Sequence, residues 1–146
     1  MSYWDTSALV KLYVPEADSP DFERYAGNPS ATFVTAGIAS WEARATFRRK
    51  ESEGGIKPGA TQTLHAGLLA DIKAVEWRII EPDSAVADEF ARVLDLCAGQ
   101  NPPLLIRTLD AIHLASARMA GETEMVATDK RLRAAAIALG FTLFPK

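Results

Sequence analysis

Residues 125–144 read MVATDKRLRAAAIALGFTLF, a pattern in which two short apolar runs flank a helical segment. We expect a strand over residues 125–128 and a helix over residues 129–139, where apolar side chains recur at helical spacing. Gly140 ends that helix, and residues 141–144 form the next strand. Two strands joined through a helix need a crossover connection, and crossovers join parallel strands. The stretch therefore predicts a β-α-β unit of a parallel sheet.

The remainder of the chain repeats this alternation of short extended runs and longer helical segments. Further strands are expected over residues 2–5, 31–35 and 76–81, and further helices over residues 6–14, 17–26, 38–53, 58–74, 84–98 and 104–120. Strands that alternate with helices predict an α/β protein with a parallel sheet and helices on both of its faces. A length of 146 residues fits a single domain over residues 1–146.

Composition and charge narrow the class of protein. Hydrophobic residues make up 48% of the chain and charged residues 24%, which matches soluble globular proteins. The formal net charge of −3 gives no overall attraction for nucleic acid, so any such contact must be local. No apolar run approaches the roughly 20 residues that cross a bilayer, and the start of the chain lacks the basic segment of a signal peptide. We expect a cytoplasmic protein without membrane contact.

Two aspartates stand where an expected strand ends and a helix begins. Asp5 follows the apolar pair Tyr3-Trp4, and Asp129 follows the run at residues 125–128. Each could simply cap its helix, since aspartate is a favoured N-cap residue. In open parallel sheets, however, ligands bind beyond the carboxyl ends of the strands. Two acids at the same place on two strands favour a shared crevice.

Asp110 is the most informative acid, because its helix LLIRTLDAIHLASARMA, residues 104–120, is apolar on nearly every side. A buried carboxylate without a partner is costly. Arg107 and His113, each three residues away, can share its helical face. Asp110 therefore belongs either to an ion pair with Arg107 or to a functional cluster. Glu42, early in its own helix, is informative only together with the other acids.

Other side chains with possible chemistry have simpler interpretations. The one cysteine, Cys97, excludes an intramolecular disulfide and a cysteine zinc site, and its apolar surroundings predict a buried side chain. His113 is expected to be a structural residue of its helix, and His65 is expected to be exposed. Core positions rather than base-stacking ones are predicted for the three tryptophans, Trp4, Trp41 and Trp77.

Four segments resemble the PIN-domain family, in particular toxin ribonucleases of the VapC type. They are YWDTSALVKLY at residues 3–13, SWEARATFRR at 40–49, RTLDAIHLASA at 107–117 and VATDKRLRAAAIALGF at 126–141. Each segment contains one acid, and the four occur in the family's order. The resemblance implies a three-layer α/β/α sandwich with a central parallel sheet. It also implies an acidic pocket that binds Mg²⁺ or Mn²⁺ and cuts single-stranded or looped RNA.

Carried over by position, the family's catalytic and metal-binding acids fall on Asp5, Glu42, Asp110 and Asp129. Mg²⁺ prefers oxygen ligands, so carboxylates suit it better than histidines or thiolates. The ion would activate a bound water that attacks phosphorus and leaves a 5′-phosphate. Without metal, crowded carboxylates repel one another, so we expect a raised pKa for at least one of them.

Hydroxyl side chains are expected to support the acids. The hydroxyl residue that follows the family's first aspartate is matched by Thr6, with Ser7 after it, and Thr128 precedes the fourth acid. One departure concerns the residue two positions before that acid. Family members often have threonine or serine there, whereas this chain has Ala127. The polar support on that side of the pocket therefore differs from the family pattern.

Basic residues near the acids could form a positive rim that binds RNA phosphates. An ordinary solvated helix face is the alternative for each group. The candidates for RNA contact are Lys11, Arg44, Arg48, Lys130 and Arg131.

Alternative functions and partners remain open. One is a PIN-like protein-binding module without catalysis, although no acid is missing, and another is a housekeeping RNA-processing nuclease. A phosphate-accepting receiver domain would need an acidic pair beside the first strand, where Asp5 has Trp4 and Thr6 as neighbours. A toxin would have a small cognate antitoxin as partner. The family, and apolar side chains such as Leu12, Tyr13 and Leu68, also suggest a homodimer.

Overall fold

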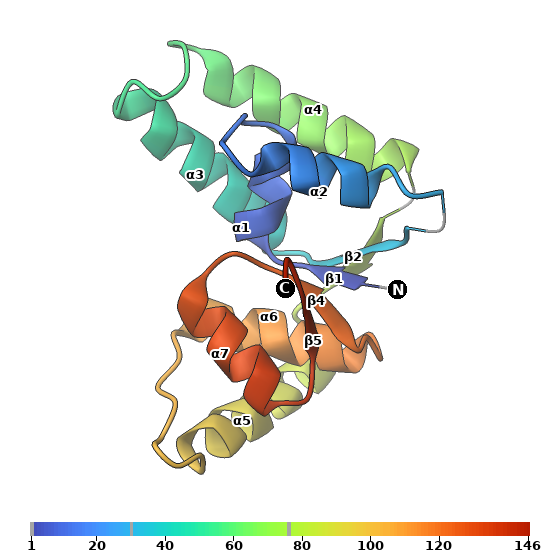
Figure 1. Cartoon of the computed structure of the whole chain (residues 1–146), viewed down its shortest axis with the longest axis vertical. Helices are drawn as coiled ribbons and strands as arrows, with labels where there is room; N and C mark the ends of the chain where they lie inside the picture. The colour runs from blue at the N-terminus through green and yellow to red at the C-terminus, as the bar shows by residue number, and fades with distance from the viewer. Residues whose placement is uncertain (1, 30, 76) are drawn as a thin grey trace.

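A parallel sheet of five strands divides the molecule into two helical layers (Figure 1). The computed structural model describes residues 2–29, 31–75 and 77–146. The strand order is β3-β2-β1-β4-β5, and all four pairings are parallel. The strands are β1 Ser2–Trp4, β2 Phe33–Ala36, β3 Arg78–Ile80, β4 Glu124–Val126 and β5 Thr142–Phe144. The predicted α/β sandwich with a central parallel sheet is confirmed.

The helices cover both faces of this sheet. The layer drawn above the sheet in Figure 1 contains α1 to α4, and the layer below it contains α5 to α7. None of the described helices is long and apolar enough to span a membrane. Their bounds are α1 Thr6–Leu9, followed by the 3-10 turn η1 Val10–Leu12, α2 Ser19–Ala26, α3 Ala39–Ser52, α4 Ala60–Ala74, α5 Ser84–Ala98, α6 Thr108–Met119 and α7 Lys130–Ala138.

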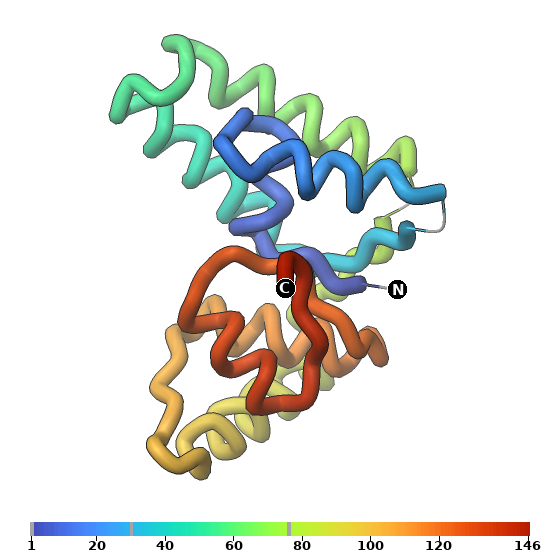
Figure 2. Tube along the Cα trace, viewed as in Figure 1, coloured from blue at the N-terminus to red at the C-terminus, as the bar shows by residue number. Residues whose placement is uncertain are grey.

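The strand order places the first strand beside the two C-terminal strands. The chain proceeds from β1 outward through β2 to β3, then crosses to β4 and β5 on the other side of β1. Figure 2 shows this as the blue first strand lying between the cyan β2 and the orange and red segments of the C-terminal part. The order reverses between β1 and β4, and a crevice opens at the carboxyl ends of strands at such a point. The topology therefore predicts a site beside the ends of β1 and β4.

Alternating side chains of β1 connect the sheet to both layers. Successive strand residues point to opposite faces, so Tyr3 belongs to the core on the α5–α7 side and Trp4 to the core on the α1–α4 side. Trp77 contacts Phe33 there, with ring centroids 4.6 Å apart. The predicted core positions of Trp4 and Trp77 are confirmed, and Cys97 is buried as expected.

Three of the expected burial states are wrong. Trp41 is 70% exposed, because it lies on the side of α3 that turns away from the sheet. His65 is only 9% exposed, because it faces α3 across the α3–α4 hairpin and its Nε2 hydrogen-bonds Ser40 O at 3.1 Å. Leu68 is fully buried in the core beneath α4 and is therefore not a free dimer contact, whereas Leu12 and Tyr13 are half-buried.

Two helix boundaries also differ from the expectation. The helix expected over residues 6–14 is α-helical only to Leu9 and tightens into η1. The helix expected from residue 104 begins at Thr108, because the Asp110 carboxylate accepts the Arg107 N–H and forms a capping box there. The strand expected from residue 76 begins at Arg78 in the described chain, and residue 76 itself lies outside the described residues.

Candidate active site

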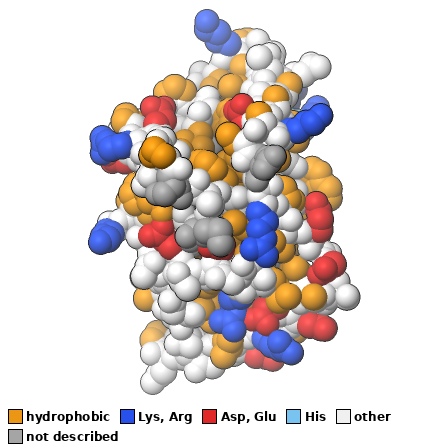
Figure 3. Space-filling view, turned by 90° about the vertical axis from the view of Figure 1, so that its right-hand side faces the viewer, with side chains coloured by type: hydrophobic (Ala, Val, Ile, Leu, Met, Phe, Trp, Pro, Cys, Tyr) orange, Lys and Arg blue, Asp and Glu red, His pale blue; other side chains and the backbone are white. Residues whose placement is uncertain are grey.

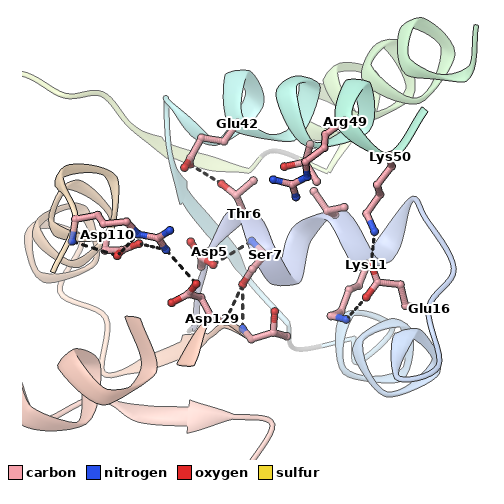
Figure 4. Close-up of a pocket in the computed structure, with 14 residues that line it drawn as sticks. Asp5, Thr6, Ser7, Lys11, Glu16, Glu42, Arg49, Lys50, Asp110 and Asp129 are labelled. Atoms are coloured by element: carbon pink, nitrogen blue, oxygen red, sulfur yellow. Dashed lines mark hydrogen bonds and ion pairs between the residues drawn. The ribbon is translucent and has the colours of Figure 1, made fainter. Parts of the chain in front are cut away.

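The four acids singled out by the sequence line one pocket of about 290 Å³ at the carboxyl ends of the strands. Asp5 follows β1 and Asp129 follows β4, while Glu42 and Asp110 lie in the first turns of α3 and α6. Figure 4 shows Asp5, Asp110 and Asp129 near one another, with Glu42 reaching from α3 toward Thr6. Elements of both helical layers therefore supply the carboxylates.

Asp5 and Asp129 are both helix caps and pocket residues. One oxygen of each carboxylate is used locally: Asp5 Oδ2 accepts Ser7 N at 3.0 Å. Asp129 Oδ1 accepts the N–H groups of Arg131 and Leu132 at 2.9 and 3.0 Å. The cap fixes the side-chain rotamer and leaves the second oxygen of each residue for the pocket. The capping and site interpretations of the sequence are thus compatible.

Arg107 joins two of the acids. Its Nε donates to Asp110 Oδ2 at 3.1 Å, and its Nη2 donates to Asp129 Oδ2 at 3.1 Å. The Arg107 side chain is 59% exposed, whereas that of Asp110 is only 10% exposed. The sequence left an ion pair or a functional cluster open for Asp110, and the geometry shows the ion pair, at the wall of a pocket that the other three acids also line.

Glu42 is held by Thr6, which was expected to support the acids, and by His113, whose contact with an acid the sequence analysis did not predict. Its Oε2 accepts Thr6 Oγ1 at 2.7 Å and lies 2.6 Å from His113 Nε2. The other ring nitrogen, Nδ1, lies 2.7 Å from the hydroxyl of Tyr3. His113 Nε2 is also 3.5 Å from Asp5 Oδ1, so this histidine contacts the site directly. The signal was its position three residues after Asp110, on the same helical face.

The pKa values of two acids in the pocket are shifted in the direction opposite to a raised carboxyl pKa. Burial opposes ionisation of Glu42, but hydrogen bonds from His113 and Thr6 and the charge of Arg107 outweigh it, so its pKa is lowered. Burial also opposes ionisation of Asp129, and the backbone N–H groups of α7 together with Arg107 again lower its pKa. Burial disfavours protonated His113, yet Asp5, Glu42 and Asp110 raise its pKa overall. A raised pKa was expected for at least one of the four acids, whereas the pKa values of Glu42 and Asp129 are lowered, because cations and N–H donors surround these two carboxylates.

Ser7 supports the fourth acid from across the crevice. Its Oγ accepts Thr128 N at 2.9 Å and Asp129 N at 3.4 Å, which ties the end of β4 to the start of α1. Thr128 itself lines the pocket. Ala127, where the family often has a hydroxyl, is fully buried. The polar support on this side therefore comes from Ser7.

The predicted basic rim is only partly at the pocket. Lys11 is 7% exposed, and its Nζ lies 2.6 Å from both Glu16 Oε2 and Asp18 Oδ1. Lys11 therefore lines the pocket, but two carboxylates neutralise its charge, and its contact with RNA stays a prediction. Lys130 and Arg131 are exposed at the start of α7 but do not line the pocket, and Arg44 and Arg48 line another groove.

Other charged residues also line the pocket. Arg49 and Lys50, which belong to the same basic run after Glu42 as Arg44 and Arg48, line it, and so does Glu16, a fifth carboxylate that the sequence analysis did not single out. Glu16 Oε1 lies 2.7 Å from Lys50 Nζ. Glu16 lies in the loop after η1, and the contact of that loop with α3 brings its carboxylate to the pocket.

An all-carboxylate donor set suits Mg²⁺ or Mn²⁺ in its chemistry. The side chains are, however, too far apart as they lie: among the described residues, no three His, Cys, Asp or Glu side chains are close enough to hold an ion together. Arg107 occupies Asp110 and Asp129, and His113 occupies Glu42. The side chains fit a hard divalent ion in kind, and the exposed guanidinium of Arg107 is free to rotate away from them.

Comparison with known proteins identifies the family of the chain. The family model of the PIN domain matches residues 2–138. The chain belongs to the PIN-domain family. This PIN-domain protein is 34% identical over 143 residues to Ribonuclease VapC46 of Mycobacterium tuberculosis, which covers 97% of this chain and 94% of that protein.

Solved structures share the fold at low sequence identity. Mycobacterium tuberculosis VapC20, a toxin that cleaves the sarcin-ricin loop, superposes with a TM-score of 0.69 at 15% identity, over 92% of this chain and 95% of that one. A toxin-antitoxin complex from Klebsiella pneumoniae gives a TM-score of 0.58 at 16% identity, over 90% and 89% of the chains. A protein with this fold has thus been crystallised in a toxin-antitoxin complex.

Proposed function

We propose that this protein is a metal-dependent endoribonuclease that hydrolyses RNA phosphodiester bonds and acts as the toxin of a VapBC-type toxin-antitoxin pair. The observation that carries the proposal is the convergence of Asp5, Glu42, Asp110 and Asp129 on one pocket at the strand-order reversal. The 34% identity to a VapC ribonuclease over nearly the whole chain supports the same activity.

These four carboxylates would hold Mg²⁺ or Mn²⁺. When bound, the ion would polarise the phosphodiester and lower the pKa of a water that attacks phosphorus. The capping hydrogen bonds of Asp5 and Asp129 keep those side chains in place before any ion arrives. Thr6 and His113 orient Glu42 in the same way.

Cations at the pocket would bind the RNA backbone. Arg49, Lys50 and Arg107 line the pocket, and a phosphate chain exchanges its counterions for such side chains. Lys130 and Arg131 extend from the helix that Asp129 caps, so we keep them as candidates for more distant phosphates. Local charge of this kind acts despite the net charge of −3.

The proposed macromolecular partners are a small cognate antitoxin and a second copy of the chain. Structures with this fold include toxin-antitoxin complexes. An antitoxin that covers the acidic pocket would explain how a cell tolerates the nuclease.

RNA cleavage by the purified protein tests the function. We expect cleavage with Mg²⁺ or Mn²⁺ and none with EDTA. Asp5→Asn should lower the rate about a hundredfold or more, because it removes an ion ligand while asparagine still caps the helix. Asp83→Asn is the matched control, since Asp83 caps α5 through Val86 N at 3.0 Å and lies outside the pocket. Equal cleavage by parent and Asp5→Asn would refute the assignment.

A further inference from the structure

An exposed aromatic side chain stands beside the acidic pocket. Trp41 precedes Glu42 in the first turn of α3, and its side chain is 70% exposed. The other tryptophans, Trp4 and Trp77, are buried in the core. Among the tryptophans, Trp41 is therefore the one whose ring a ligand can contact.

Trp41 forms one end of a groove of about 610 Å³ between α3 and α4. Arg44 and Arg48 of α3 line the same groove. Arg48 Nη1 donates to Glu51 Oε1 at 3.0 Å. Arg44 Nη1 lies 3.4 Å from His65 Nδ1, which is available as an acceptor because His65 Nε2 hydrogen-bonds a backbone carbonyl. The other residues that line the groove are Ala45, Gly59, Thr61 and Gln62.

Helix α3 separates this groove from the acidic pocket. One side of the helix gives Glu42, Thr46 and Arg49 to the pocket, and the other gives Trp41 and Arg44 to the groove. A helix with its side chains is about 10–12 Å across. A few nucleotides of single strand can cross that distance, so an RNA with one phosphate in the pocket can reach the groove.

The chemistry of the groove selects its occupant. Two arginines and one acid line the groove, so its lining has a net positive charge in a chain whose net charge is −3. The face at the amino ends of the strands, by contrast, intermingles acids and bases (Figure 3). A docked protein helix needs a row of apolar pockets at helical spacing, whereas the large apolar side chain lining this groove is Trp41 alone. An indole face beside guanidinium groups fits unpaired bases and phosphates.

We propose that the α3–α4 groove is a base-binding subsite for single-stranded RNA that extends out of the acidic pocket. Trp41 stacks on an unpaired base, and Arg44 and Arg48 neutralise the adjoining phosphates. The proposal rests on the ribonuclease function above and adds to it a binding site for one unpaired base outside the acidic pocket. Stacking tolerates every base, so the subsite strengthens binding without fixing the sequence.

Binding of a fluorescein-labelled, mixed-sequence single-stranded RNA 20-mer in EDTA tests the subsite without cleavage. Trp41→Ala should weaken the Kd about fivefold or more, as for loss of one stacked base, and Trp41→Phe should stay within about twofold of the parent. Ile137→Ala is the matched control, because Ile137 is 62% exposed on α7 and lines neither hollow. Unlabelled RNA should also quench the tryptophan fluorescence of the parent, since Trp41 is the exposed indole among the three.

The outcomes separate the subsite from the function. A parent protein that cleaves RNA, with Trp41→Ala binding it as tightly as the parent, overturns the subsite and leaves the nuclease intact. If Trp41→Ala instead weakens only antitoxin binding or self-association, the groove is a protein interface and the proposal is wrong. A parent that neither binds nor cleaves RNA refutes the proposed function itself.

Discussion

Arg107 places a positive charge between two acids of the pocket. Its guanidinium joins Asp110 to Asp129, and these contacts raise the pKa of Arg107 itself, chiefly through Asp110. The arginine thus substitutes for the cation that the carboxylates are expected to bind. Because its side chain is largely exposed, it can leave without breaking the core. A divalent ion and Arg107 should therefore compete for the same two acids.

Removing the positive charge of Arg107 should strengthen the binding of a divalent ion by the acids. Arg107→Gln is expected to bind Mn²⁺ about fivefold more tightly, which corresponds to the roughly 1 kcal/mol upper range of an exposed ion pair. Isothermal titration calorimetry without RNA measures this directly. Arg92→Gln is the control, because Arg92 pairs with Glu89 away from the pocket. Unchanged or weaker Mn²⁺ binding by Arg107→Gln would show that the arginine does not compete with the ion.

At the scale of elements, a carboxylate at the end of α3 caps the start of α4. Gly59, the N-cap of α4, has a φ of 83° and no side chain to cap the helix. Glu51 supplies the cap from the end of α3, accepting Gly59 N at 3.0 Å and Thr61 N at 2.9 Å. Hydrogen bonds from Thr61 and Gly59, with a smaller contribution from the charge of Arg48, lower the pKa of Glu51 to about 2.

This cap should make the stability of the protein depend on pH. The folded pKa of Glu51 is below its unfolded value of 4.5, so its contribution is complete above pH 4.5 and is lost as the pH falls toward 2. Glu51→Gln should lower the Tm at pH 6 and bring parent and variant together near pH 2. Glu53→Gln, at an exposed position just after α3, is the control in thermal scans. A Tm difference that is constant from pH 6 to 2 would contradict the cap.

Over the whole molecule, the pocket lies where the two helical layers meet. Asp5 and Glu42 belong to the side of α1 and α3, and Asp110 and Asp129 to the side of α6 and α7 (Figure 1). An ion held by all four would link the two layers through the edge of the sheet. Metal binding should therefore stabilise the fold as a whole.

Thermal unfolding in Mg²⁺ and in EDTA measures this link. At a hundredfold excess over its dissociation constant, a ligand stabilises by about 2.7 kcal/mol, which predicts a rise in Tm of roughly 5–10 °C for a chain of this size. Asp129→Asn should melt near the parent in EDTA, because asparagine still caps α7, and should gain little from Mg²⁺. Asp83→Asn should keep the full Mg²⁺ shift. A parent whose Tm is the same in both buffers would speak against an ion in this pocket.

The sequence by itself determined the elements and the chemical type of the site. Helix α5 spans Ser84–Ala98 as predicted, and Asp5 and Asp129 cap helices at strand ends as predicted. Such features depend on side chains a few residues apart, so local spacing reveals them.

Only the tertiary structure decided how the charges pair and which faces stay open. Arg107 meets Asp129 across 22 residues, Glu42 meets His113 across 71, and Tyr3 meets His113 across 110. These contacts exist because the strand order places β1 beside β4, and a local pattern contains no information on strand order. The exposure of Trp41 and the burial of Lys11 have the same origin, since burial depends on which element packs against a helix face rather than on the residues beside it.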